Sequence, residues 1–475
     1  MLKQLKRLGG DSLLYALMNV GTKLIAFLML PIYTTYLNPS EMGAFELIES
    51  IVSILTFVII FGTDNALAYY FYKEKEEKDK EQFFKTALSF RLVIAMVFFL
   101  IFIVMGPYFA EVFLGSRDYY SVVLIAGTVL ISEAVITLLL TFDRFNFKSK
   151  KVAGLTVFKL LLVALSSYVL LKFLNLKVES IYIGRLISGL VVLVFLIRPL
   201  FNFLSFKFRK DQLIKLLRYG APLVPASIAF WIITFSNRIF LSMFESLESV
   251  GIFGVAIKFA TVITLLTSSV QMAWRPYSMS IKDQPNAKKI YANIFYIILI
   301  IGMLGLISIA SLAPFLLKFM VPDMIYMEAA NYIAMLSLGS FLSFYYLIVS
   351  VGLFLEEKTA VISIYVGISA VVSVILNISL IPLFSIWGAV LALVISYVLV
   401  NVLIFIKSQS VYYIPVSLKK LLIPFIGGVI STGSIVIIYM YNFNSYYIFI
   451  SWIFFFIVLL LTGFGKTVLN FTRGR

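Results

Sequence analysis

Long apolar runs, separated by short charged or Pro/Gly/Asn-containing breaks, follow one another along the whole chain of 475 residues. A helix that crosses the hydrocarbon core of a bilayer needs about 20 mostly apolar residues, so a span with its connection takes roughly 30–35. The length therefore accommodates about fourteen spans and no sizeable soluble domain. The composition agrees, because 61% of residues are hydrophobic and 13% are charged, against about 25% charged in soluble domains. The sequence predicts an all-α polytopic membrane protein.

The ends of the apolar runs predict the individual spans. They are expected at about 12–36, 42–71, 84–106, 119–142, 152–174, 179–201, 219–243, 250–274, 290–315, 328–353, 360–381, 386–406, 420–441 and 446–465.

The basic residues are distributed unevenly between the two sides of this arrangement. Of the 39 Lys and Arg residues, 29 fall in connections expected on one side together with both termini, and four fall on the other side. Cytoplasmic connections of membrane proteins carry an excess of Lys and Arg. The pattern predicts an even number of spans with both termini in the cytoplasm. It also explains the net charge of +16 without a nucleic-acid partner.

The most basic connection suggests where the chain divides. Residues 198–218 follow six spans and precede six more, which predicts two six-helix lobes with the same orientation, a parallel repeat. Two correspondences share one offset: Gly43-Ala44-Phe45 with Gly251-Ile252-Phe253, and Lys150 with Lys358. The expected segments are an N-terminal lobe at 1–201, a basic cytoplasmic linker at 202–218, a C-terminal lobe at 219–407, and an appended helix pair with a tail at 408–475.

Several classes of chemistry are excluded by residues that the chain lacks. It contains no Cys and no His, which removes disulfides, Cys/His metal sites, thiol nucleophiles and His-based catalysis. No Gly-rich phosphate-binding loop of the Walker type occurs, which argues against ATP hydrolysis. We expect a protein that is not an enzyme and that needs neither metal nor cofactor.

Ionisable residues inside the expected spans are the candidates for function, because such groups are costly in hydrocarbon and usually face a bundle interior or a water-filled path. Six are basic and four are acidic, and all lie in the first eight spans: Lys23, Glu46, Glu49, Asp64, Arg91, Glu133, Lys159, Arg185, Arg238 and Lys258. Lys23 and Glu133 are expected nearest the middle of the membrane. Tyr15, Asn19 and Lys23 share one face of the first span. The carboxylates Glu46, Glu49, Asp64 and Glu133 are the only embedded candidates for proton coupling.

Plainer roles for these charges stay open at this stage. Lys159 and Arg238 lie close enough to span ends to extend their charged groups into the interface. Glu46, Glu49, Arg185 and Lys258 could form structural ion pairs between helices.

An ordered set of segments carries a resemblance to a known family. Asn19–Phe45, Phe61–Ala66, Tyr219–Pro225 with Ser236-Asn237-Arg238, and Leu376–Ala389 resemble corresponding segments of the polysaccharide transporter family in the MOP flippase superfamily. Each segment alone is a loose apolar pattern, and the specificity lies in their order along nearly the whole chain.

The resemblance implies a flippase of the bacterial inner membrane. It would move undecaprenyl-pyrophosphate-linked repeat units to the outer leaflet by alternating access, for O-antigen, capsule or exopolysaccharide assembly. Its partners would be membrane lipid, the polyprenyl-pyrophosphate-linked glycan, and a polysaccharide polymerase with chain-length proteins. We expect Lys23, Arg238 and Lys258 to bind the pyrophosphate, Arg91 and Arg185 to assist, and Glu133 to act as a counter-ion or proton site.

Four other functions remain as alternatives. A multidrug exporter of the same superfamily would want acidic walls for cationic drugs, and a lipid II flippase would differ in glycan specificity. An integral-membrane glycan polymerase would need a large outer loop carrying catalytic acids. A purely structural subunit would have little use for ten embedded charges.

Overall fold

The computed structural model describes residues 18, 20–204, 209–441 and 443–463. Within these ranges the regular structure is helical throughout, and no strand occurs. The prediction of an all-α chain is confirmed. The extreme termini lie outside the described residues, and so does part of the predicted linker. The predicted cytoplasmic location of both termini depends on these residues.

Twelve of the fourteen predicted spans correspond to helices that are long and apolar enough to cross a membrane. In the described part of the chain, the first and last predicted spans correspond to the shorter apolar helices Val20–Tyr36 and Tyr446–Leu461. The chain is therefore a multi-pass membrane protein, as the apolar runs predict.

The described residues form two compact units. Unit 1 contains the chain up to Trp231 together with Leu241–Gly251, and unit 2 contains Ile232–Phe240 and the chain from Ile252 onward. The chain thus passes from one unit to the other within α11 (Val224–Phe244) and α12 (Leu247–Ala260). The predicted boundaries of two six-helix repeats and an appended pair stay a prediction.

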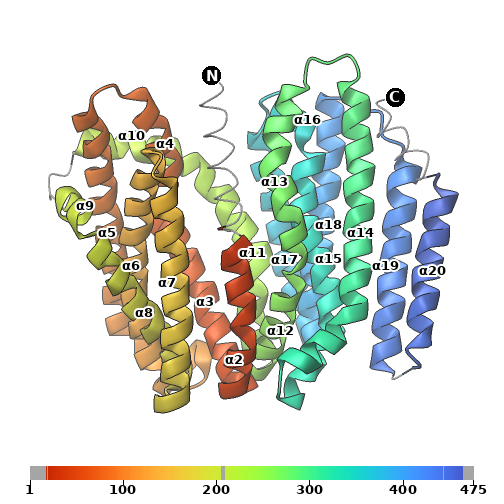
Figure 1. The fold of residues 1–475 in the computed structure, drawn as a ribbon, viewed down its shortest axis with the longest axis horizontal. Coiled ribbons are helices and arrows are strands. Elements are labelled where there is room, and N and C mark those ends of the chain that lie inside the picture. The colour runs from red at the N-terminus through yellow and green to blue at the C-terminus, as the bar shows by residue number, and fades with distance from the viewer. Residues whose placement is uncertain (1–17, 19, 205–208, 442, 464–475) are drawn as a thin grey trace. The chain divides into compact units, whose positions relative to one another are not determined.

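The described helices of unit 1 are α2 (Leu30–Tyr36), α3 (Pro39–Ile60), α4 (Thr63–Lys73), α5 (Glu77–Leu114), α6 (Tyr120–Phe145), α7 (Ser149–Val169), α8 (Lys177–Phe195), α9 (Ile197–Phe203) and α10 (Lys210–Gly220), with short helical turns at Arg117–Tyr119, Leu170–Leu174 and Ala221–Leu223. The longer ones run side by side, and α10 lies across one end of them (Figure 1). Helix α5 packs against α6, α7 packs against α8, and α6 also contacts α3 and α8.

Local sequence explains where α3 begins and ends. The Asn38 side chain accepts a hydrogen bond from the Glu41 backbone N–H at 2.9 Å, and the Asn38 N–H donates to the Glu41 carboxylate at 3.0 Å. This reciprocal cap satisfies two backbone donors that would otherwise lack partners. Helix α3 ends at Phe61 and Gly62, both in the left-handed region with φ of 45° and 69°. A side chain at Gly62 would also collide with the backbone of Gly220, so the sequence permits this bend before α4.

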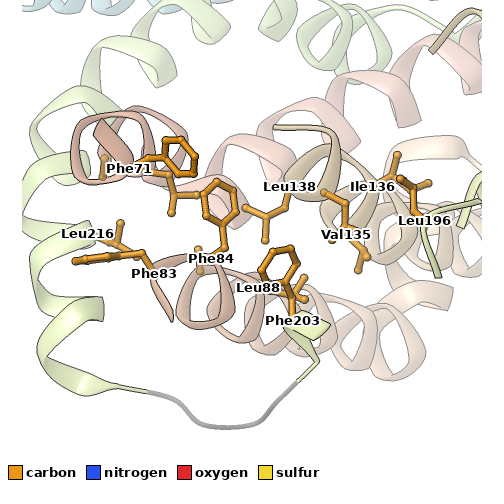
Figure 2. Packing of buried hydrophobic residues seen from close by; sticks show 14 of the residues in the cluster. Phe71, Phe83, Phe84, Leu88, Val135, Ile136, Leu138, Leu196, Phe203 and Leu216 are labelled. Atoms are coloured by element: carbon orange, nitrogen blue, oxygen red, sulfur yellow. The ribbon is translucent and has the colours of Figure 1, made fainter. Parts of the chain in front are cut away.

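One end of unit 1 is closed by a large apolar cluster (Figure 2). Phe84 is fully buried at its centre, between Leu138 of α6 and Phe203 of α9, and Leu216 of α10 packs against the same cluster. The side chains of α4, α5, α6, α9 and α10 therefore share one core. The short helices α9 and α10 are fixed to the bundle by it.

Unit 2 is a second bundle. Beyond α12 it contains α13 (Ile263–Ser280), α14 (Ala287–Met320), α15 (Ala330–Val349), α16 (Val351–Leu355), α17 (Ala360–Phe384), α18 (Ile386–Val411), α19 (Leu418–Met440) and α20 (Tyr446–Leu461), with a helical turn at Met324–Ala329. Helices α17 and α18 form a tight hairpin, because Ser385 has a φ of 51° and Gly388 packs directly on the backbone of Leu380. Helix α19 packs against α14, and α20 packs against α19.

Candidate functional site

A carboxylate from α3 and a guanidinium from α8 form a two-pronged ion pair inside unit 1. The Arg185 Nη1 donates to Glu49 Oε1 at 2.6 Å, and its Nη2 donates to Oε2 at 3.0 Å. The Tyr182 hydroxyl donates to the same Oε1 at 2.9 Å. The guanidinium also lies 5.7 Å from the centre of the Phe45 ring and 5.4 Å from that of Tyr182. Two parallel bonds and two aromatic neighbours hold Arg185 in one orientation.

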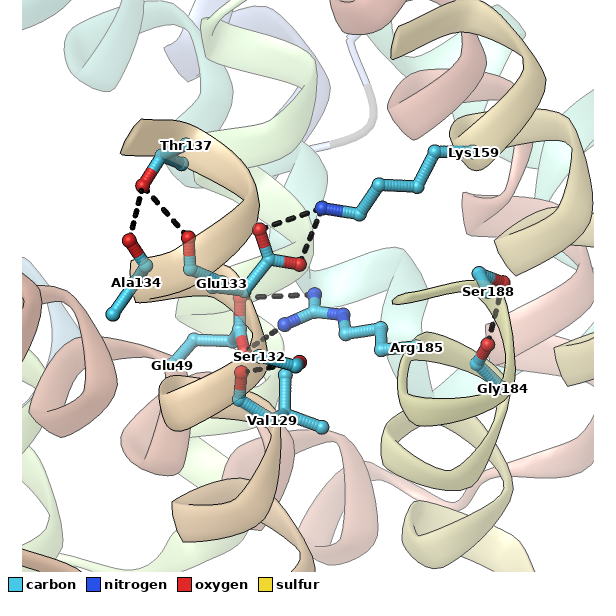
Figure 3. Close-up of polar contacts among 10 residues, drawn as sticks. All are labelled: Glu49, Val129, Ser132, Glu133, Ala134, Thr137, Lys159, Gly184, Arg185 and Ser188. Carbon is cyan, nitrogen blue, oxygen red and sulfur yellow. Dashed lines mark hydrogen bonds and ion pairs between the residues drawn. The ribbon is translucent and has the colours of Figure 1, made fainter. Parts of the chain in front are cut away.

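A second ion pair lies beside the first and joins α6 to α7 (Figure 3). The Lys159 ammonium donates to both carboxylate oxygens of Glu133, with 2.6 Å to Oε2. The Lys159 side chain is 17% exposed and that of Glu133 is 30% exposed. The Lys159 side chain therefore lies inside the bundle. The sequence had left open that it extends to the membrane interface.

Glu133 also lines a cavity of about 170 Å³. Its other walls are Thr56, Ile59 and Ile60 of α3 together with Leu130, Ala134 and Thr137 of α6. A buried water needs roughly 10–15 Å³ of such space and two to four polar partners. The carboxylate and the two threonine hydroxyls supply polar atoms, so the cavity has room for several waters next to the ion pair.

The third pair lies where α3 bends into α4. Arg91 of α5 is fully buried, and its Nη2 donates to Asp64 at 2.5 Å and to the Thr63 hydroxyl at 2.8 Å. Asp64 is 39% exposed, so the pair joins a buried cation to a carboxylate at the edge of the bundle. The Arg91 Nε and Nη2 are held by these partners, whereas its buried Nη1 has no hydrogen-bond partner among the described residues. Its role as an accessory cation stays a prediction.

The remaining four candidates are divided between the units. Lys23 is exposed on the helix Val20–Tyr36, and Glu46 is almost fully buried in α3 of unit 1. Arg238 of α11 and Lys258 of α12 belong to unit 2. Arg238 is 5% exposed, and its guanidinium lies 5.3 Å from the Phe235 ring centre and 5.6 Å from that of Phe253. The side chain therefore lies inside unit 2. The sequence had left open that it extends to the membrane interface. Tyr15 and Asn19, expected to share a face with Lys23, lie outside the described residues.

Sequence reasoning counted Lys159 among the embedded bases but did not pair it with Glu133, although a signal for the pairing existed. Glu133 and Lys159 are equally distant along the chain from Asn146, which is the turn between α6 and α7. Residues equidistant from the turn of an antiparallel helical hairpin lie at the same depth. Tyr182 left no comparable signal, because its contact with Glu49 joins helices far apart in the sequence. Thr63 left none because it and its partner Arg91 lie at unequal distances from the turn between the consecutive helices α4 and α5.

Comparison with known proteins assigns the chain to a class. A family model described as polysaccharide biosynthesis protein matches residues 8–282, more than half of the chain. The chain belongs to this family, as the ordered segments of the sequence indicate. No curated protein sequence matches it.

Solved structures share the fold. A structure described as lipid II flippase MurJ, inward closed conformation, superposes with a TM-score of 0.75 at 14% identity, covering 98% of this chain and 100% of that one. An inward-facing multidrug resistance MATE family transporter of the MOP superfamily gives 0.58 at 15% identity, covering 82% and 94%. The MATE multidrug transporter DinF-BH gives 0.61 at 15% identity, covering 86% and 96%. At such identities the likeness establishes the MurJ/MATE-like fold.

Proposed function

We propose that this protein is a flippase for lipid-linked oligosaccharides. It moves polyprenyl-pyrophosphate-linked repeat units from the inner to the outer leaflet of the bacterial inner membrane, for O-antigen, capsule or exopolysaccharide assembly. The family match supports a role in polysaccharide biosynthesis, and the fold is one that flippases and exporters use. A polysaccharide polymerase and chain-length proteins would act on the flipped product.

One observation favours an anionic substrate. Three embedded carboxylates, those of Glu49, Glu133 and Asp64, each hold one embedded base. Counted over all ten embedded positions, six bases stand against four acids, a net charge of +2. A substrate pyrophosphate is the counter-charge that the proposed function supplies, and an exporter of cationic drugs would want the opposite sign.

The proposed roles follow from this division. Lys23, Arg238 and Lys258 bind the pyrophosphate. Arg185 is held by Glu49, and Arg91 is held by Asp64. Both ion pairs keep neighbouring helices in register. Arg185 and Arg91 assist substrate binding only if their ion pairs open during transport. Glu133 is the best-placed carrier for a coupling proton, because it faces the cavity, which has room for water next to its carboxylate. The protein itself breaks no bond in this cycle.

Alternating access requires the two units to change their arrangement. They are joined within α11 and α12, and Arg238 lies on the part of α11 that belongs to unit 2. A movement of unit 2 therefore carries Arg238 with it. This would couple the pyrophosphate to the conformational cycle.

The test is flipping by purified variants in proteoliposomes that contain a fluorescent polyprenyl-pyrophosphate oligosaccharide. We expect Arg238→Ala to lower the initial rate about tenfold or more, because a hydrogen bond to a charged group contributes about 1.5–3 kcal/mol. Arg238→Lys should restore the rate only partly, since an ammonium lacks the two-pronged geometry of guanidinium.

A matched control separates binding from folding. Lys318→Ala removes an exposed base in the last turn of α14 in the same unit and should leave the rate unchanged. Full flipping by an Arg238→Ala protein that melts like the unsubstituted chain would remove Arg238 from the proposed binding site. The same vesicles loaded with fluorescent lipid II distinguish a lipid II flippase, which would prefer that substrate.

A further inference from the structure

Two short helices at one end of unit 1 each bury a single face. Phe203 of α9 and Leu216 of α10 are 2% and 0% exposed, and both enter the apolar cluster around Phe84 (Figure 2). The Thr86 hydroxyl of α5 donates to the Gln212 side chain of α10 at 3.2 Å. Both helices are thus held against the bundle, and α10 packs on α4 and α5 where these spans end (Figure 1).

The opposite faces of these helices carry exposed apolar side chains. Phe201 is 70% exposed and Ile214 is 53% exposed. Each precedes its buried partner by two residues, a rotation of about 200° around a helix with 3.6 residues per turn. Phe201 and Ile214 therefore point away from the core that Phe203 and Leu216 enter.

The same exposed surface is strongly basic. Five exposed bases accompany one exposed acid over the described part of α9, α10 and the residue before α10: Arg198, Arg209, Lys210, Lys215 and Arg218, against Asp211. Asp211 lies 3.6 Å from Arg209. Even with that pair formed, four exposed bases remain without a carboxylate among the ion pairs of the described residues.

Depth and composition together favour one occupant. The surface lies at the ends of α4 and α5, which is the level of the lipid headgroups if these helices span the bilayer. A basic helix that also exposes isolated apolar side chains is typical of segments that lie in a membrane interface. Each Lys or Arg near an anionic leaflet contributes about 1 kcal/mol of attraction. A topological signal alone would need the bases but not Phe201 and Ile214.

We infer that the basic surface formed by α9 and α10 binds the anionic phospholipid headgroups of the leaflet at this end of unit 1. The phosphates contact the bases of α10, while Phe201 and Ile214 enter the upper part of the acyl layer. The lipid thereby braces the segment that leads into α11. This inference is independent of the transported substrate.

The test uses the cysteine-free chain, which accepts one label at a time. Ile214→Cys carries an environment-sensitive dye, and the protein is placed in nanodiscs of phosphatidylcholine alone or with phosphatidylglycerol. We expect a blue shift of the emission that grows with the phosphatidylglycerol fraction and is lost near 1 M salt, where the screening length falls to about 3 Å. A dye on Lys78→Cys, an exposed position of α5 with acidic neighbours, should show no such dependence.

A charge-neutralised variant completes the test. In Ile214→Cys carrying Lys210→Gln, Lys215→Gln and Arg218→Gln, the response to phosphatidylglycerol should disappear. The control neutralises Lys73, Lys75 and Lys78 instead and should retain it. Emission that is the same in neutral and anionic nanodiscs, or that responds equally in the neutralised variant, would overturn the inference. If the neutralised variant does not fold, the salt titration of the singly labelled chain decides alone.

Discussion

The ion pair between Glu133 and Lys159 allows a quantitative prediction. Removing one partner of a dry buried pair costs about 3–5 kcal/mol, because a charge is left without compensation. Here the side chains are 30% and 17% exposed, and the neighbouring cavity of about 170 Å³ lets water approach the remaining charge. We therefore expect Glu133→Gln and Lys159→Gln each to lower the free energy of unfolding by about 2–3 kcal/mol.

The double variant separates the pair from its surroundings. With both charges removed, neither group is left buried alone, so the combined loss should be smaller than the sum of the single losses by about 1–3 kcal/mol. Denaturant titration of the four proteins in one mild detergent measures this coupling. A double-variant loss that equals the sum of the two single losses to within about 0.5 kcal/mol would show that the two side chains act independently. The ion pair would then not stabilise the site.

The same proteins test the proposed coupling role. If Glu133 carries the proton, flipping by Glu133→Gln should no longer respond to an imposed proton gradient, while Lys159→Gln should still respond. An unchanged response to the gradient in Glu133→Gln would remove this residue from energy coupling.

Two further predictions concern topology and packing. A single Cys at Asn444 should react with a membrane-impermeant maleimide in intact cells, and a Cys at Lys78 should react only after permeabilisation; the reverse pattern would contradict the orientation. Gly251→Ala should lower the free energy of unfolding by about 1–3 kcal/mol, because the added Cβ would overlap the Pro39 carbonyl. Gly367→Ala in α17, where nothing lies within 4 Å of the added Cβ, should be neutral or slightly stabilising. Equal melting temperatures of the two variants would show that the backbones at Gly251 and Pro39 can separate.

The apolar pattern was sufficient to locate the helices that cross the membrane, because insertion into hydrocarbon depends on local composition. It was less informative at helix ends. Most of helix α10 lies in the segment 202–218 predicted as a linker, since a helix with one apolar face and several charged residues does not form an apolar run. Its anchor, Leu216, becomes recognisable only once Phe84 and Phe203 are placed around it.

The embedded charges could be found from the sequence, but their pairing could not. Glu49 and Arg185 are brought together by packing between α3 and α8, which lie far apart along the chain. Asp64 and Arg91 lie on the consecutive helices α4 and α5, but at unequal distances from the turn between them, so spacing alone does not pair them. Glu133 and Lys159 are different, because they are equally distant from the turn of one hairpin, which sets their depths. Pairs equally distant from a hairpin turn are predictable from spacing, and the other pairs need the fold.

The most direct test of the central claim compares substrates that differ only in charge. Proteoliposomes containing the unsubstituted protein are loaded with a fluorescent oligosaccharide on polyprenyl pyrophosphate or on the uncharged polyprenol, and transbilayer movement is followed by quenching from outside. The proposed function predicts rapid protein-dependent movement of the pyrophosphate lipid and little movement of the uncharged one, with free inorganic pyrophosphate slowing the first. Equal rates for both lipids, or movement of neither while a cationic dye is exported, would contradict it.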